Sequence, residues 1–175
     1  IRDRLDALAA RPVAFGVQTR IDLWKPDMLA RLGAAGCVSI EAGVESLTLE
    51  GRARLDKNCK LQTGELPERL RIANQYVPFV QANLIAQPDD DDAEIEHWRQ
   101  SLRGHGVWAN DPVPLFPYPG SPDYRKLWGL PDEWAWERAH AYYLDQFDHF
   151  SDVQLERPQP LHALERANPT QGALP

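Results

Sequence analysis

The stretch Leu115–Tyr124 reads LFPYPGSPDY and marks the point where the character of the chain changes. Its prolines, Pro117, Pro119 and Pro122, fix their φ angles and lack a backbone N–H, which excludes a helix interior or a central strand. The stretch is therefore expected to be a stiff, ordered loop of the kind that positions functional groups on a scaffold. A rigid connector without function is the alternative interpretation of this segment taken alone.

Upstream of this loop, short apolar runs alternate with amphipathic segments. Helical periodicity begins near Pro26, Leu66 and Asp91, and a further helix precedes the first apolar run. The second strand is expected to turn at Gly43. The expected strands are Val13–Val17, Cys37–Ile40, Val77–Ala86, and a fourth strand built from Val107–Trp108 and Val113–Leu115. Such alternation predicts an α/β fold with about four parallel strands and flanking crossover helices.

Downstream of the loop, aromatic residues dominate the helical pattern. Tryptophan, tyrosine and phenylalanine residues recur between Leu127 and Phe150. We expect residues 1–120 to form the α/β part and residues 121–157 to form a C-terminal helical appendage on the outside of the sheet. The last segment, residues 158–175, is expected to be a loosely ordered tail.

The composition limits the classes of partner. The chain has 175 residues, a net charge of −7, an acidic run at Asp89–Asp92 and two cysteines. Nucleic acid is not an expected partner, because phosphate binding needs clustered Lys and Arg. No apolar run is long enough for a membrane span, and cytoplasmic localisation with reduced thiols is the expectation. Cys37 is expected to be a small buried residue, and Cys59 to be an ordinary loop thiol.

Polar clusters follow each expected strand, where parallel α/β folds place their ligands. Arg20 and Asp22 follow the first strand, and Glu45 and Ser46 follow the second. The third is followed by residues 87–92, and the fourth runs into the proline-rich loop. Each residue also has a structural interpretation, such as Asp22 capping the next helix, Glu45 on a solvated turn, or Asp91 capping a helix. For Asp91 the capping role is preferred.

Three spaced motifs carry a resemblance to a known family. They read Thr-Arg-Ile-Asp at 19–22, Ala-Gly-Cys-x-x-Ile-x-x-Gly-Val-Glu-Ser at 35–46, and Pro-Tyr-Pro-Gly-Ser-Pro-x-Tyr at 117–124. Together with the acidic turn around Pro88, they make the chain resemble the radical S-adenosylmethionine superfamily. The subgroup it resembles has an upstream cobalamin-binding domain and includes enzymes similar to the anaerobic magnesium-protoporphyrin cyclase.

The resemblance implies a partial (β/α) barrel in which the strand from Val13 is the third and the later strands are the fourth to sixth. It implies cofactor-binding positions at Arg20, Glu45, Ser46, Gln87 and Tyr118. The fifth-strand turn of the family is glycine-rich, and this chain replaces its glycines. The resemblance names no catalytic residue.

The sequence departs from the family at the iron–sulfur cluster. The family holds a [4Fe–4S] cluster with a Cys-x3-Cys-x2-Cys loop, and Cys37 and Cys59 cannot supply three thiolates. The resemblance therefore implies the C-terminal part of a longer parent, which carries the cluster and possibly cobalamin elsewhere. The parent would cleave S-adenosylmethionine reductively to a 5′-deoxyadenosyl radical, then transfer methyl or run another radical step. This fragment alone is not expected to be active or to hold a metal.

The expected partners are a small-molecule substrate, the rest of the parent chain and a possible second copy that covers the exposed strand edge at Val13–Val17. A non-catalytic α/β binding or interaction module is the alternative, supported if several tryptophans are exposed. A third interpretation is a barrel hydrolase or aldolase fragment that uses Glu41, Glu45 and Asp89–Asp92 as acids. No Ser, His and Asp in the order of a catalytic triad support it. Glu45 could also simply pair with Arg20, Arg52 or Arg54.

Overall fold

The computed structural model describes residues 1–55, 59, 61–62, 64–86 and 90–146. It confirms an α/β fold built on one four-stranded sheet, in which all neighbouring strands are parallel and follow the order β1-β2-β3-β4. The strands are β1 (Phe15–Thr19), β2 (Cys37–Glu45), β3 (Phe79–Leu84) and β4 (Trp108–Ala109). Within the described residues, β1 pairs with β2 alone and lies at an edge of the sheet.

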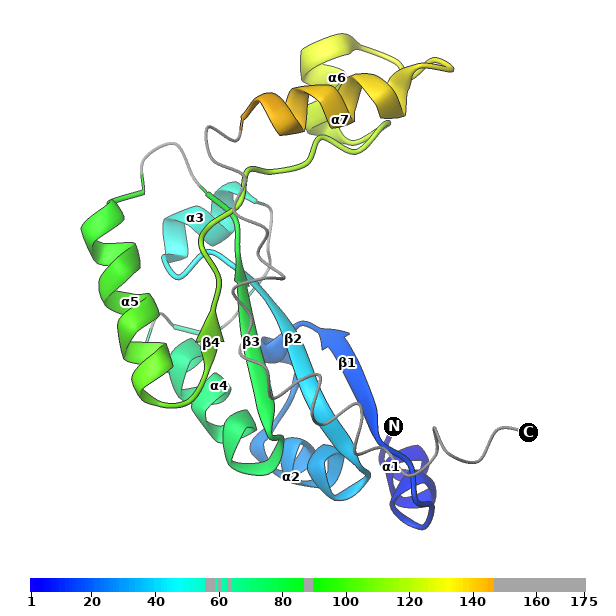
Figure 1. The fold of residues 1–175 in the computed structure, drawn as a ribbon, viewed down its shortest axis with the longest axis vertical. Coiled ribbons are helices and arrows are strands. Elements are labelled where there is room, and N and C mark those ends of the chain that lie inside the picture. The colour runs from blue at the N-terminus through cyan, green and yellow to red at the C-terminus, as the bar shows by residue number, and fades with distance from the viewer. Residues whose placement is uncertain (56–58, 60, 63, 87–89, 147–175) are drawn as a thin grey trace.

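Three helices return the chain between the strands over the same face of the sheet, as Figure 1 shows for α2, α4 and α5. Parallel neighbours need such crossovers because the chain must come back to the starting end of the sheet. The helices are α1 (Arg2–Ala9), α2 (Pro26–Ala34), α3 (Leu49–Arg54), α4 (Glu65–Tyr76), α5 (Asp92–Gly104), α6 (Pro122–Trp128) and α7 (Ala135–Asp145), with a 3₁₀ turn at Ile21–Leu23.

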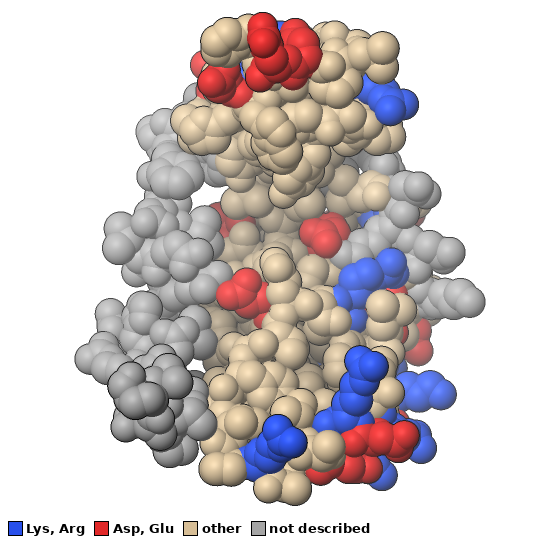
Figure 2. Space-filling model, turned by 90° about the vertical axis from the view of Figure 1, so that its right-hand side faces the viewer, with Lys and Arg blue, Asp and Glu red and all other residues tan. Residues whose placement is uncertain are grey.

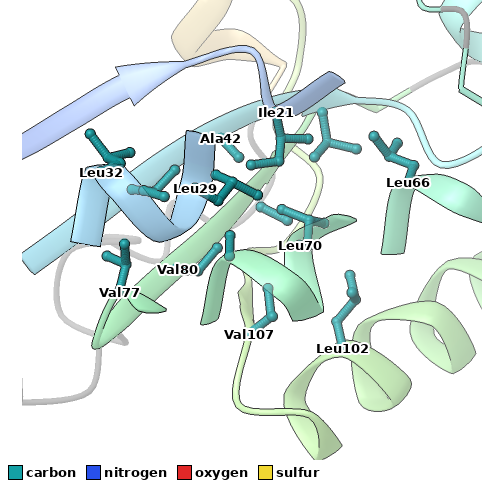
Figure 3. Close-up of a cluster of buried hydrophobic side chains, with 14 of the residues drawn as sticks. Ile21, Leu29, Leu32, Ala42, Leu66, Leu70, Val77, Val80, Leu102 and Val107 are labelled. Atoms are coloured by element: carbon teal, nitrogen blue, oxygen red, sulfur yellow. The ribbon is translucent and has the colours of Figure 1, made fainter. Parts of the chain in front are cut away.

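The main hydrophobic core lies between the sheet and these helices. Alternate strand residues such as Ala42 and Val80 point to the helices, where Leu29 and Leu70 meet them (Figure 3), and Ile40 belongs to the same core. A Cβ at position 33 would lie 2.3 Å from the carbonyl oxygen of Tyr76, so glycine there allows α2 and α4 to pack closely. The alternating apolar residues of the strands and the periodic apolar residues of the helices therefore bury their side chains in the same core.

Two local predictions are wrong. The second strand continues through Gly43, which pairs with Asn83 of β3, and turns only at Glu45. Pairing with β3 continues through Gly43, so the glycine is not the turn. The helix α3 was not expected. It starts at the Thr48 cap, whose side chain accepts a hydrogen bond from the backbone of Gly51.

The proline-rich loop leads from the sheet to the appendage, as expected. Ser121 caps α6 by accepting from the Tyr124 N–H at 3.1 Å, and Pro122 occupies the first turn. We call this loop with α6 and α7 the cap. The cap has its own small core of Tyr124, Ala135 and Ala139, and it lies beyond the carboxyl ends of the strands instead of on the outside of the sheet (Figure 1). Residues 147–157 of the expected appendage and the expected tail, 158–175, lie outside the described residues.

Candidate functional site

The carboxyl ends of β1 and β2 bring two of the expected site residues together. Arg20 follows β1 directly, and Glu45 is the last residue of β2. The pKa of Arg20 is raised, first by its hydrogen bond to Asp22 and then by smaller charge effects that include Cys59 and Glu45. Glu45 and Cys59 therefore lie near the guanidinium.

Asp22 orients Arg20. Its Nε and Nη2 donate to the two carboxylate oxygens of Asp22 at 3.2 and 2.8 Å. The Asp22 side chain is only 7 % exposed, because it sits on the 3₁₀ turn under the end of β1. A forked pair of this kind fixes both the position and the plane of the guanidinium.

Glu45 has a strained backbone. Its φ is +66°, a value that residues other than glycine rarely adopt, and it is the only such residue in the part of the chain that the structure describes. The Ser46 N–H donates to the Val44 carbonyl at 2.9 Å, which makes a γ-turn centred on Glu45. The Glu45 carbonyl still accepts from the Ile85 N–H at 2.7 Å. Strain of this type costs about 1–3 kcal/mol and is concentrated at functional sites.

The Ser46 hydroxyl serves the adjoining loop. Ser46 is buried, and its Oγ accepts from the Thr48 N–H and contacts the Thr48 Oγ1, both at 3.2 Å. A Cβ at position 51 would lie 2.1 Å from this Oγ, so Gly51 is what leaves room for it. Ser46 is thus placed beside Glu45 as expected, with its hydroxyl engaged in starting α3.

Arg52 organises the same loop, whereas the sequence suggests it only as an ion-pair partner of Glu45. Its side chain is buried, and it donates to the carbonyl oxygens of Ser46, Leu47 and Leu61 at 3.1, 3.0 and 3.3 Å. Within the described part of the chain Arg52 makes no ion pair, so it does not neutralise Glu45. A lone arginine has no sequence pattern that would have revealed this role.

Tyr118 belongs to the cap. Its ring lies 4.8 Å from that of Phe116 and 6.2 Å from that of Trp136, between centroids, and the residue is 60 % exposed. The structure thus gives Tyr118 aromatic partners on the loop and α7, not on the ends of the strands.

Gln87, the remaining expected site residue, lies outside the described residues, as does Asp89. Asp91 caps α5 as preferred, accepting from the Ala93 N–H at 2.9 Å.

A second group of polar residues lies on the face of the sheet opposite the helices. Gln18, Glu41, Gln81 and Trp108 stand side by side in register, one from each strand. We call this the polar face. The sequence contains a signal for it, because polar residues alternate with apolar ones at 39 and 41 and at 81 and 83. The third apolar run looked wholly buried, which hid that alternation.

Figure 2 shows the molecule from the side on which β1 lies in Figure 1. Acidic side chains appear at the top, on the cap, and in the middle of this view, whereas Lys and Arg gather mainly in its lower part. The described cations at the carboxyl ends of β1 and β2 include Arg20, which pairs with Asp22, and Arg52, which donates to the backbone carbonyls of Ser46 and Leu47.

The two cysteines lie at opposite ends of the sheet. Cys37 begins β2 in the hydrophobic core, and burial raises its pKa to about 11, which confirms the expectation of a small buried residue. Cys59 lies close to Arg20, at the carboxyl ends.

Among the residues that the structure describes, no group of three His, Cys, Asp or Glu side chains could hold a metal ion. These residues do not fit an iron–sulfur cluster.

None of the described helices is both long enough and apolar enough to cross a membrane. No protein-family model matches this chain, and no curated protein matches it.

Proposed function

We propose that this chain forms one wall of the cofactor site of a radical S-adenosylmethionine enzyme, as the C-terminal part of a partial (β/α) barrel. The observation that carries the proposal is that Arg20, oriented by Asp22, and the strained Glu45 lie near each other at the carboxyl ends of β1 and β2. Parallel α/β enzymes bind ligands at these ends.

The two side chains suit the amino-acid end of S-adenosylmethionine. A guanidinium binds a carboxylate with charge-assisted hydrogen bonds, and a carboxylate accepts from an ammonium group. Asp22 fixes the guanidinium before any ligand arrives, so less entropy is lost on binding. Ser46 contributes the loop that holds Glu45, and Tyr118 contributes from the cap.

S-adenosylmethionine, when bound, supplies the reactive carbons of its sulfonium centre. The role proposed for this chain is to orient the cofactor, to exclude water and to face the small-molecule substrate. The [4Fe–4S] cluster does not fit the cysteines of this chain, so the proposal assigns it, with any cobalamin, to other segments of the parent. Methyl transfer or related radical chemistry is the proposed activity of that parent.

The test is calorimetric titration of the chain with S-adenosylhomocysteine, a stable analogue that keeps the amino-acid end. We expect saturable binding that Arg20→Ala weakens about tenfold or more, because a hydrogen bond to a charged group contributes about 1.5–3 kcal/mol. Arg71→Ala is the matched control, since Arg71 makes an equally forked pair with Glu68 on the surface of α4. No saturable binding, or equal affinities of wild type and Arg20→Ala, would overturn the proposal.

A non-catalytic interaction module is the second candidate, and the cap favours it. Trp134 and Trp136 are 60 % and 61 % exposed, and Leu130 is more exposed still. Exposed aromatic groups of this kind are enriched at interfaces between proteins. Sedimentation of the chain separates the candidates: the interaction module predicts self-association that Trp134→Ser with Trp136→Ser abolishes, and no effect of S-adenosylhomocysteine.

A further inference from the structure

The polar face contains a glutamine whose hydrogen bonds are incomplete. Gln81 is in the middle of β3 and is 2 % exposed. Its Nε2 donates to the Asn83 Oδ1 at 2.5 Å, whereas its Oε1 is buried and has no hydrogen-bond partner. A buried acceptor without a donor is costly, so native proteins leave few of them. The Oε1 of Gln81 is thus an acceptor available to a ligand.

The neighbouring strand places an incomplete donor beside it. Trp108 of β4 is the register partner of Gln81, so the two side chains share the polar face. The Trp108 Nε1 is buried without a partner as well. The Arg103 guanidinium lies 4.6 Å from the centroid of the indole ring, which holds the ring in place. Trp24 shows the usual situation, since its Nε1 donates to the Thr19 Oγ1 at 2.9 Å.

The charges around the pair favour a neutral ligand group. Glu41 is the register partner of Gln81 on β2, and Arg103 lies over Trp108 on the other side. Because these two residues carry opposite charges, their effects on an anionic or a cationic group oppose each other. A neutral group that offers a hydrogen-bond donor next to an acceptor can pair with both the Gln81 Oε1 and the Trp108 Nε1.

We propose that Gln81 and Trp108 recognise a carboxamide or lactam group of the substrate, with its N–H donating to the Gln81 Oε1 and its C=O accepting from the Trp108 Nε1. This inference rests on the proposed function and names the substrate class for the same site, because the polar face would be the inner wall of the barrel. Both atoms are buried.

The test uses the ¹⁵N-labelled chain and two small probes of the same shape. 2-Pyrrolidinone has the lactam N–H and C=O, and γ-butyrolactone lacks the N–H. We expect 2-pyrrolidinone to shift the indole signal of Trp108 and the side-chain amide signals of Gln81 with saturation. γ-Butyrolactone is expected to bind about tenfold more weakly, because it leaves the Gln81 acceptor unpaired.

The chain supplies matched controls. The Trp24 indole, which already has a partner, and the exposed Gln100 amide should not shift. Gln81→Met keeps the length of the side chain and should abolish saturation, whereas Gln100→Met should not. If Gln81→Met does not fold, Trp108→Phe removes the indole donor and is expected to weaken 2-pyrrolidinone binding about tenfold.

The inference is overturned if the Trp108 and Gln81 signals change only linearly, if Trp24 shifts equally, or if both probes bind alike. It is also overturned if the spectra show a direct hydrogen bond from the Trp108 indole to Gln81. Its failure is separable from that of the proposed function. Loss of pyrrolidinone binding with intact S-adenosylhomocysteine binding removes only this inference, and the reverse result removes only the cofactor assignment.

Discussion

The buried guanidinium of Arg52 donates to the carbonyl oxygen of Ser46, 3.1 Å away, and thereby ties α3 to the end of β2. The same side chain also holds the Leu47 carbonyl, so it anchors both residues that follow the strained Glu45. The backbone strain at Glu45 is therefore maintained by hydrogen bonds from Arg52, seven residues further along the chain. A loop that holds a residue in this conformation must be stabilised by such surrounding contacts.

Replacement of Arg52 should be among the more damaging changes in this chain. Arg52→Met removes the donors and leaves buried carbonyls unpaired, so the free energy of unfolding should fall by about 2 kcal/mol or more. Urea denaturation measures it, with Arg71→Met on the surface of α4 as the control that should change it by less than about 0.5 kcal/mol. Equal effects of the two changes would show that Arg52 does not anchor the loop.

Glycine at position 45 should relieve the backbone strain. Glu45→Gly and Glu45→Ala lose the same side-chain contacts, but only glycine adopts φ +66° without steric cost. The glycine variant should therefore be more stable than the alanine variant by about 1 kcal/mol. At Glu41, in the extended part of β2, the order should reverse, because glycine in a strand interior is less favourable than alanine. Thermal or urea unfolding of the four variants checks both orders.

Alanine at position 51 should disturb the start of α3. Its Cβ would lie 2.1 Å from the Ser46 Oγ and 2.7 Å from the Ser46 Cβ, so the loop must shift. We expect Gly51→Ala to lower the free energy of unfolding by about 1–3 kcal/mol, the usual cost of overpacking. Gly104→Ala, where a Cβ would meet nothing within 4 Å, should instead be neutral or stabilising by up to about 1 kcal/mol. A neutral Gly51→Ala would contradict the close contact.

Cys37 should make stability depend on alkaline pH. Burial raises its pKa from the ordinary value of 9.0 to about 11, so between these values the unfolded chain loses the thiol proton and the folded chain keeps it. The stabilisation that comes from the protonated Cys37 thiol is fully present below pH 9 and is lost as the pH rises towards 11. The free energy of unfolding falls over this range by at most about 1.4 kcal/mol per pH unit. The difference in urea stability between wild type and Cys37→Ala measures it. A difference that does not change with pH in this range would contradict the prediction.

The sequence by itself determined the class of fold and the order of its elements. The apolar runs near 13, 37, 77 and 107 became neighbouring parallel strands because each is separated from the next by a helical segment, which forces a crossover. The caps at Asp91 and Ser121 and the burial of Cys37 were also predictable, since they depend on local chemistry and apolar pattern. The expected positions of Arg20 and Glu45 at one end of the sheet follow from strand direction alone.

Only the tertiary structure decided how those side chains are used. Asp22 holds Arg20, the Ser46 hydroxyl serves α3, and Tyr118 joins the aromatic residues of the cap. The partnership of Gln81 with Trp108 depends on the register of β3 with β4, which no local pattern specifies. Hydrogen bonds and register join residues that are distant in the chain, so their choice depends on packing of the whole sheet.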